Sequence, residues 1–236
     1  MSRLEGRVVA IAGAAGGLGP TVASVLAQEG TRLALTDVDQ GRLDEVAGRL
    51  ALPSDQVDAR AVDLLDENAA RAWAAALTER FGGVDALAHL VGGWRGGQPL
   101  DRAPLADWAW LHDLLVRTVQ HTSRAFCAAL KASGNGRFVL VSAAAAQRPT
   151  STNAAYAAAK AAAEAWTLAL ADELAGTGAT ANILVVNAIL TPQMRAESPD
   201  KDYPTFTPAE DIAEAIAFVL SDAAAKMNGK RLALHP

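Results

Sequence analysis

The sequence predicts an α/β fold in which one doubly wound, parallel sheet of about seven strands carries helices on both faces. Short apolar runs alternate with longer helical patterns along the chain, as in repeated strand–helix–strand units. Most of these runs are continuously apolar, which is typical of strands buried on both faces of a parallel sheet. The 236 residues, 51% of them hydrophobic, are enough for one domain over residues 1–236 with a sizeable core.

Apolar runs and helical periodicity place the expected elements along the chain. The longest periodic stretch, Ala103–Ala132, exceeds a typical helix, and we expect it to break near Thr118. Gly30 and Gly82 stand where helix C-caps belong. The expected strands are Val8–Ala12, Arg32–Thr36, Val57–Val62, Ala86–Val91, Phe138–Ser142, Ile183–Val186 and Arg231–Leu234, and the expected helices are roughly Leu18–Glu29, Gln40–Leu50, Glu67–Phe81, Ala103–Ala132, Ala154–Ala175 and Pro208–Ser221.

The last third of the chain contains one irregular stretch, Pro192–Phe206, which holds three prolines and follows a strand. A loop of this length beside the carboxyl edge of a sheet often covers a site, so we interpret it as a lid. After it, Thr207 is expected to cap the last helix, with Pro208 at its first position and Glu210 completing a capping box.

Composition argues against several classes of function. The net charge is −5 and the sequence pI is about 5.4, without any basic run, so neither nucleic acid nor an anionic membrane is an expected partner. The single cysteine, Cys127, excludes an internal disulfide and fits a reducing compartment. No signal peptide or membrane span is visible, which predicts a cytoplasmic location. Four scattered histidines and this cysteine lack ligand spacing, so no metal site is expected.

The first strand runs into a glycine-rich turn, Gly13 to Gly19, that opens the first helix. Small residues there let backbone N–H groups approach a pyrophosphate, although a tight strand–helix turn would also use them. Asp37 ends the second strand 18 residues beyond Gly19, where a carboxylate can accept hydrogen bonds from an adenosine ribose. The combination predicts a Rossmann-type, dinucleotide-binding fold. A turn or helix-cap role for Asp37 is the alternative.

The charge of Asp37 also bears on the choice of cofactor. A carboxylate repels a 2′-phosphate, so we expect NAD(H) to be preferred over NADP(H). Pro20 brings no positive charge to offset it, whereas Arg32 and Arg42 lie nearby in the sequence.

Tyr156 and Lys160 lie four residues apart in an alanine-rich helical segment, so both side chains share one helix face. A neighbouring ammonium favours the phenolate, and the positive end of the helix dipole acts in the same direction. We therefore expect a lowered tyrosine pKa and a general acid/base at Tyr156. A surface lysine beside a half-buried tyrosine is the alternative.

The glycine turn, the acid after the second strand and Tyr-x-x-x-Lys together resemble the short-chain dehydrogenase/reductase family over nearly the whole chain. The resemblance implies that Tyr156 is the general acid/base and that Lys160 lowers its pKa and holds the nicotinamide ribose. It also implies that the glycines contact the pyrophosphate, that Asp63 contacts the adenine, and that residues near the sixth strand contact the carboxamide. For Asp63, a helix N-cap is the alternative role. The implied cofactor-binding residues are Gly13, Ala15, Gly17, Leu18, Gly19, Asp37, Asp63, Leu64, Val91, Gly92, Gly93, Lys160, Ile189 and Thr191.

The chain departs from the usual pattern of this family where the substrate would react. The active-site serine, 13 residues before the tyrosine, is replaced by Ala143, and Ser142 stands one place early, where a strand would point it to the opposite face. The asparagine of the fourth helix falls at Leu115 by ungapped count. After the fourth strand, the usual Asn-Asn-Ala-Gly is replaced by His89-Leu90-Val91-Gly92, and we interpret His89 as a structural residue. After the sixth strand, the usual Pro-Gly is replaced by Val186-Asn187.

One subgroup shares these departures. Gly92-Gly93-Trp94-Arg95-Gly96-Gly97 resembles the corresponding run of the dihydropteridine reductases, which use NADH. The resemblance implies a substrate pocket with Trp94, Leu115 and Ala143, and quinonoid dihydropteridine as the first choice of substrate. The alternatives are reduction of another carbonyl or quinone, and a non-catalytic NAD-binding sensor or scaffold. For Trp94 itself, a position in the core or an interface is the alternative.

The expected partners are therefore a small-molecule substrate and further copies of the chain. Residues Ala154–Ala175 are rich in alanine, which permits close approach of helices. In the family resembled, this helix and the one before it often form a dimer face, which implies a homodimer or homotetramer.

Overall fold

A seven-stranded parallel sheet forms the centre of the molecule, which we describe from a computed structural model over residues 2–235. The strand order is β3-β2-β1-β4-β5-β6-β9, and neighbouring strands run parallel. The predicted doubly wound α/β fold is confirmed. The strands are β1 Val8–Ala12, β2 Arg32–Asp37, β3 Val57–Ala61, β4 Ala86–His89, β5 Arg137–Ala143, β6 Thr180–Val186 and β9 Arg231–Ala233.

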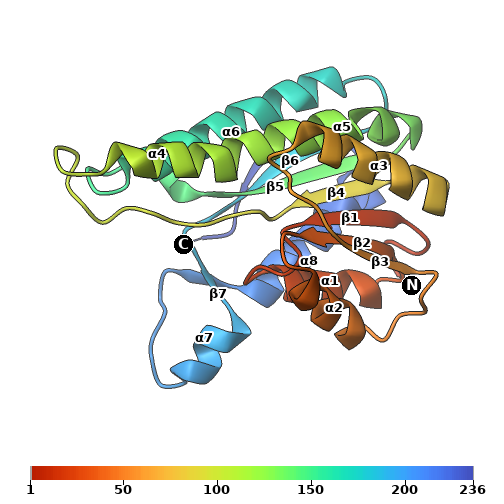
Figure 1. The fold of residues 1–236 in the computed structure, drawn as a ribbon, viewed down its shortest axis with the longest axis horizontal. Coiled ribbons are helices and arrows are strands. Elements are labelled where there is room, and N and C mark those ends of the chain that lie inside the picture. Colours follow the sequence, from red (N-terminus) through yellow and green to blue (C-terminus); the bar gives the residue numbers. More distant parts are fainter. Residues whose placement is uncertain (1, 236) are drawn as a thin grey trace.

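Helices cover both faces of this sheet (Figure 1). One apolar core lies between the sheet and α1, α2 and α8, and a second lies between the sheet and α3, α5 and α6. Strands β1, β4, β5 and β6 are buried along their whole length, which is why most of their residues are apolar. The helices are α1 Gly19–Gln28, α2 Gln40–Arg49, α3 Glu67–Phe81, α4 Leu105–His112, α5 Thr118–Ala132, α6 Ala154–Glu173, α7 Pro192–Glu197 and α8 Ala209–Leu220.

The order of the strands determines where a ligand can bind. The chain leaves β1 toward β2 and β3 on one side, then returns to β4, β5 and β6 on the other. At such a switch point the two crossover connections diverge and leave a crevice outside the carboxyl ends of the strands. The loop before α4 and the segment around α7 project from this same end of the molecule (Figure 1).

The long helical stretch does not break near Thr118 as expected. Residues Asp113–Arg117 form a π-helical turn that joins α4 to α5, and the backbone stays helical at His112 and Thr118. A π-helical turn holds one more residue than an α-helical turn, so it rotates the side chains on either side of it relative to each other. Periodicity alone does not reveal such an insertion, and its consequence appears in the site.

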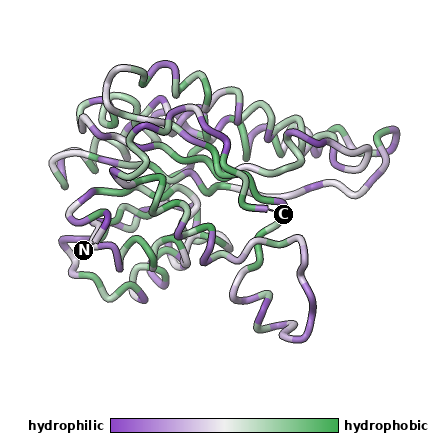
Figure 2. The backbone as a smooth tube through the Cα atoms, turned by 180° about the vertical axis from the view of Figure 1, so that it is seen from behind, coloured by the Kyte–Doolittle hydropathy of each residue, from purple (hydrophilic) through white to green (hydrophobic). Residues whose placement is uncertain are grey.

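The expected irregular stretch is partly regular. It begins with α7, and its ends are joined by a small parallel sheet of β7 Ala188–Leu190 with β8 Phe206–Pro208. Tyr203 is nearly buried within it, packs edge-on against Phe206 and donates its hydroxyl hydrogen to the carbonyl of Met194 at 3.3 Å. The excursion projects from the body of the molecule and contains both hydrophilic and hydrophobic residues (Figure 2).

The capping box expected at the last helix is wrong. Pro208 is the N-cap residue of α8, and no side chain caps it. The Thr207 hydroxyl donates instead to the Leu234 carbonyl at 2.6 Å, because this residue belongs to β8 and faces the end of β9. The expected C-terminal glycine of α3 is confirmed, since Gly82 has φ of 81°.

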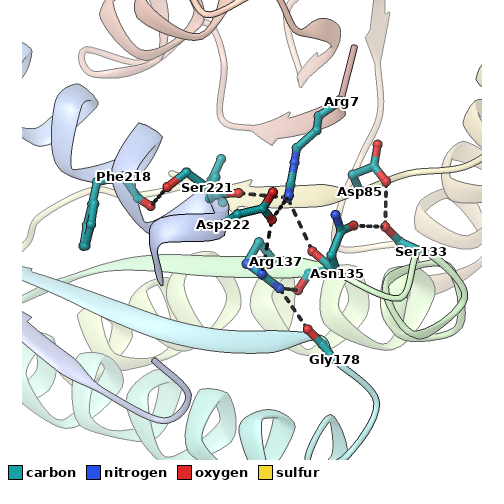
Figure 3. A network of polar contacts seen from close by, with 11 residues as sticks. Arg7, Asp85, Ser133, Asn135, Arg137, Gly178, Phe218, Ser221 and Asp222 are labelled. Atoms are coloured by element: carbon teal, nitrogen blue, oxygen red, sulfur yellow. Dashed lines mark hydrogen bonds and ion pairs between the residues drawn. The ribbon is translucent and has the colours of Figure 1, made fainter. Parts of the chain in front are cut away.

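A polar cluster closes the amino edge of the sheet, opposite the ligand-binding edge (Figure 3). Arg7, in the turn that precedes β1, forms an ion pair with Asp222, which follows α8. The fully buried Arg137 of β5 lies 3.9 Å from the same carboxylate. Beside them, Ser133 donates to Asp85 at 2.6 Å. These contacts join four segments that are distant in sequence, so they fasten the end of the sheet away from the site.

Within the described residues, 2–235, no helix is long and apolar enough to cross a membrane. Nor is there, within that range, a group of three or more histidine, cysteine, aspartate or glutamate side chains arranged to hold a metal ion.

Candidate active site

A cleft of about 820 Å³ opens at the carboxyl ends of the central strands. This volume is in the range of pockets that enclose cofactors and small ligands. Fifteen of the residues expected in a site line it: Gly13, Gly17, Leu18, Asp37, Asp63, Leu64, Val91, Gly92, Gly93, Trp94, Ala143, Tyr156, Lys160, Ile189 and Thr191. The chain thus brings together residues from almost every strand end.

The glycine turn lies at one wall of the cleft. Gly13 has φ of 85°, and a Cβ atom there would be 2.8 Å from the Val91 nitrogen, so the turn and the end of β4 approach closely. A Cβ on Gly17 would point across the cleft to Thr191, at 3.3 Å. The missing side chains leave a cradle beside the start of α1, and an anionic pyrophosphate fits such a helix N-terminus.

Two expected cofactor-binding residues, Ala15 and Gly19, do not line the cleft. A Cβ on Gly19 would be 2.2 Å from the Ala14 carbonyl oxygen, so this glycine is required by packing inside the turn. Ala15 is buried, and its amide donates to Asp37 at 3.1 Å. The glycine spacing predicted the turn correctly but could not separate ligand contacts from internal contacts.

Asp37 lies at the far end of the cleft and is not a helix cap. Its carboxylate accepts hydrogen bonds from the amides of Ala15 at 3.1 Å and Val38 at 2.8 Å. The neighbouring Asp39 caps α2 by accepting from the Arg42 amide at 3.1 Å. Arg42 also lines the cleft, and its guanidinium donates to the Ala15 carbonyl. One fixed carboxylate and one fixed cation therefore face the same end of the cleft.

Asp63 also lines this end, beside Leu64 and the partly exposed Leu65. Its carboxylate accepts from the Leu65 amide at 2.9 Å. The alternative role as a helix cap is wrong, because Asp66 caps α3 and accepts from two amides of its first turn.

Tyr156 and Lys160 share one face of α6 and both line the cleft. Lys160 is 6% exposed, and its Nζ donates to the Val141 carbonyl at 3.0 Å. The same Nζ lies 6.0 Å from the centre of the Tyr156 ring. Burial lowers the pKa of Lys160 to about 8, and the Glu164 carboxylate partly opposes that shift.

The expectation of a lowered tyrosine pKa is wrong for the protein without bound ligand. Burial raises the pKa of Tyr156 to about 12, because the phenolate is poorly solvated inside the protein. Lys160 directs its ammonium to the Val141 carbonyl rather than to the phenol oxygen. At neutral pH the phenol is therefore fully protonated.

Ser142 is among the residues that line the cleft, but its hydroxyl is directed to Glu164. Ala143 lines the cleft with a methyl group, and the Ser142 hydroxyl donates to Glu164 at 2.6 Å inside the protein. The serine one place early in the sequence thus faces α6, as strand alternation requires.

Leu115 does not line the cleft, contrary to expectation. It is 2% exposed and packs with Leu111, Val116 and Ala159 beneath α6. The lining residues of this helix are instead Trp110, Asp113, Leu114 and Thr118. The π-helical turn accounts for the error, because it rotates the helix face that an ungapped count assumes to be constant.

Two tryptophans form the outer wall of the cleft, of which only one was expected. Trp94 is 59% exposed, so a position in the core is excluded, and Trp110 on α4 lies beside it along the lining. The glycines between and around them make room for the indoles. A Cβ on Gly93 would lie 2.8 Å from the Trp110 ring, and a Cβ on Gly96 would lie 3.0 Å from the Trp94 ring and 2.9 Å from the Thr152 carbonyl.

His89 lies behind the cleft and is fully buried. Its two ring nitrogens contact the hydroxyls of Thr118 at 3.3 Å and Thr122 at 3.1 Å. Burial, together with the charge of Lys160, lowers the pKa of His89 to about 3, so the ring is neutral at physiological pH. The interpretation as a structural residue fits this packing.

The fold and this cleft define a class of protein: a nucleotide-binding α/β domain with a Tyr-Lys pair at the reaction end. The sequence profile of the family described as short chain dehydrogenase matches residues 7–202. The chain belongs to the short-chain dehydrogenase family, whose members are oxidoreductases that bind a nicotinamide cofactor.

Particular relatives share the family but differ in substrate. The D-threitol dehydrogenase of Mycolicibacterium smegmatis is 29% identical over 241 residues, covering 98% of this chain and 92% of that protein. The 2,3-dihydroxy-2,3-dihydro-p-cumate dehydrogenase of Pseudomonas putida is 32% identical over 189 residues, or 80% of this chain and 73% of its own length. A short-chain dehydrogenase from Brucella melitensis superimposes with a TM-score of 0.86 at 29% identity, over 98% of this chain and 96% of its own. None of these three is named as a pteridine reductase.

Proposed function

We propose that this oxidoreductase uses NADH to reduce a planar, conjugated, electron-deficient acceptor, with quinonoid dihydropteridine as the first choice. The observation that carries the proposal is the composition of the reaction end. Tyr156 and Lys160 line it, Ala143 replaces a hydroxyl donor, and two indoles border it. A flat acceptor that accommodates charge within its own ring suits such a site.

The choice of NADH follows from Asp37. Its carboxylate faces the end of the cleft farthest from Tyr156, where it can accept hydrogen bonds from ribose hydroxyls and repel a 2′-phosphate. Arg42 shares that end but already donates to the Ala15 carbonyl. The cradle at Gly13 and Gly17 is suited to the pyrophosphate, and Ile189 and Thr191 are placed to contact the carboxamide.

Bound NADH would supply the hydride, and the protein would supply the proton. Tyr156 is the donor in this proposal, since its phenol is protonated at neutral pH and lines the cleft. The buried ammonium of Lys160, one helical turn away, stabilises negative charge that develops on the phenol oxygen as the proton leaves.

The missing hydroxyl is the reason to favour a conjugated acceptor. Removing one preorganised donor to a developing oxyanion typically costs about 2.7–4 kcal/mol, or roughly a hundred- to thousandfold in rate. A simple ketone concentrates the new charge on one oxygen and bears that whole cost. In a quinonoid ring the charge is delocalised, so the loss is smaller.

A second candidate is oxidation of a dihydrodiol of an aromatic ring, or reduction of another carbonyl or quinone. The relative from Pseudomonas putida, at 32% identity, is named for oxidation of such a ring diol, and the indoles of Trp94 and Trp110 would suit its planar product. The direction of turnover separates diol oxidation from the first candidate, and the preferred acceptor separates another carbonyl or quinone from quinonoid dihydropteridine. A purely non-catalytic sensor is disfavoured, because a binder has no need of Tyr156 and Lys160 together in its cleft.

Steady-state assays of the purified protein test the proposal. NADH oxidation is measured with quinonoid dihydropterin, an ortho-quinone and a simple cyclic ketone, and NAD⁺ reduction with a ring dihydrodiol. We expect the conjugated acceptors to exceed the ketone in kcat/KM by at least about a hundredfold. The Tyr156→Phe variant should lose about a hundred- to ten-thousandfold of that activity while still binding NADH. Equal turnover of ketone and quinonoid substrate would contradict the proposal.

Assembly and location are parts of the same proposal. A homodimer or homotetramer is supported by the alanine-rich α6 and by apolar side chains such as Leu105 and Trp108 that are exposed on α4. Light scattering of the purified protein measures the assembly, and cell fractionation tests the proposed cytoplasmic location.

A further inference from the structure

A second buried polar chain lies behind Lys160 and is not used in the proposed reaction. Glu164 is 2% exposed, on the same face of α6 and one turn beyond Lys160. One carboxylate oxygen accepts from the Ser142 hydroxyl at 2.6 Å, and the other accepts from Arg231 Nε at 2.6 Å. The three partners come from α6, β5 and β9, so the carboxylate is fixed from three sides.

We infer that Glu164 is a positioning residue for Lys160: its buried carboxylate, fixed by Ser142 and Arg231, keeps the lysine ammonium charged at the wall of the cleft. This inference rests on the proposed function, because it assigns a cause to the state of Lys160 that the reaction requires. It also gives a role to Ser142, the serine that stands one place before the usual position.

The surroundings of Lys160 show why an acidic partner is needed. Its Nζ has one hydrogen bond within residues 2–235, to the Val141 carbonyl of β5. Tyr156 faces it from the preceding turn of α6, and the neutral ring of His89 faces it from β4. Desolvation favours the uncharged amine. Glu164 supplies the negative charge that opposes this effect.

The partners of Glu164 show how that charge is maintained. A buried carboxylate without partners would take up a proton, since its charged form is poorly solvated. Ser142 donates one hydrogen bond, and Arg231 adds both a hydrogen bond and a positive charge. The Arg231 side chain is 41% exposed, so solvent still hydrates its own charge. Both oxygens of the Glu164 carboxylate therefore have a donor, and this carboxylate lies one helical turn from Lys160.

A purely structural function is the competing explanation, in which the chain only joins α6, β5 and β9. The two explanations differ in the titration of Lys160. A structural tie affects stability but leaves the pKa of a correctly folded Lys160 unchanged. A positioning role lowers that pKa when the carboxylate charge is removed, even when the fold is intact.

The experiment is a titration of Lys160 in the full chain. The sequence has only five lysines, so selective ¹³Cε-lysine labelling gives few NMR signals, and a Lys160→Met variant assigns the one required. Glu164→Gln retains the size of the side chain and its amide can still accept from Ser142, while its charge is removed. We expect its Lys160 midpoint to fall by about one pH unit or more, and the corresponding limb of the kcat/KM profile to shift with it.

Two further variants keep the test decisive. Ser142→Ala removes a hydrogen-bond donor but leaves the carboxylate of Glu164 in place, so it should lower the Lys160 midpoint by less than Glu164→Gln. Arg231→Gln removes a neighbouring positive charge, so it should not lower the Lys160 midpoint. The matched control is Glu67→Gln, which removes an exposed carboxylate that pairs with Arg71 and Arg124 far from the cleft, and it should leave the midpoint unchanged.

An unchanged Lys160 midpoint in folded Glu164→Gln, or in folded Glu164→Met if the first variant does not fold, would overturn the inference. The NMR readout does not require turnover. A protein that oxidises NADH with none of the tested acceptors would therefore contradict the proposed function while the titration still decides the role of Glu164.

Discussion

At the scale of single residues, polar atoms enclosed by apolar surroundings define the site. His89 illustrates this. Thr118 and Thr122 lie within hydrogen-bond distance of carbonyls in the preceding helical turn, and both also contact the imidazole. A neutral ring has one donor and one acceptor, so one threonine must turn its hydrogen to the ring. The neutral state of His89 therefore follows from its burial and from the charge of Lys160, and not from these contacts.

His89→Asn should change how stability depends on pH. In the folded protein the pKa of His89 is about 3, below its ordinary value of 6.5, so the unfolded chain binds more protons between these values. Stability should therefore fall as pH drops below about 6.5, by roughly 2 kcal/mol at pH 5 from this residue alone. Urea unfolding at pH 7 and pH 5 measures it. The variant should lose less stability than the wild type between the two conditions; an equal loss would argue against a buried neutral histidine.

Sequence reasoning succeeded at this scale where spacing alone fixes a side chain. Tyr156 and Lys160 are one helical turn apart, and Asp37 ends a strand, so their placement in the cleft followed from local structure. It failed for Leu115, because the π-helical turn cannot be read from the sequence. It also missed Glu164, whose partners Ser142 and Arg231 become neighbours only through the tertiary fold.

At the scale of elements, the loop after β4 is the feature specific to this chain. Its glycines allow backbone to lie directly against two indole rings, so the outer wall of the cleft depends on residues without side chains. The strands and most helices were predictable, because burial on both faces imposes long apolar runs. The pairing of β7 with β8 was not, because each has three residues and neither differs in composition from a loop.

Gly96→Ala should disturb the Trp94 indole without touching the cofactor. The new Cβ would lie 2.9 Å from the Thr152 carbonyl and 3.0 Å from the indole, so the ring must move. Loss of a stacking contact worth about 0.5–1.5 kcal/mol should raise KM for a planar acceptor roughly two- to tenfold. Affinity for NADH, measured by fluorescence, should be unchanged, because Gly96 does not line the cleft.

The matched control is Gly48→Ala in α2, where an added Cβ meets nothing within 4 Å. Alanine is a better helix former than glycine, so this variant should keep wild-type kinetics and gain up to about 1 kcal/mol of stability. If Gly96→Ala left KM for every planar acceptor at the wild-type value, Trp94 would have no part in binding the substrate.

At the scale of the whole molecule, the polar contacts that stabilise the sheet and the cleft that forms the candidate site lie at opposite edges of the sheet. The Arg7, Asp222 and Arg137 cluster fastens the amino edge (Figure 3), while the cleft occupies the carboxyl edge. The cofactor end and the reaction end lie along one cleft, formed on either side of the point where the strand order reverses. The substrate is the part that neither fold nor family defines, since relatives with this fold act on different compounds.

The central claim is that the site works without the usual hydroxyl donor, and Ala143→Ser tests it most directly. The measurement is kcat/KM with NADH for quinonoid dihydropterin and for a simple cyclic ketone, in the wild type and in the variant. The account predicts that the restored hydroxyl raises ketone turnover by roughly ten- to thousandfold and changes turnover of the conjugated acceptor by less than about threefold. An equal gain with both substrates, or a wild type that already prefers the ketone, would contradict it.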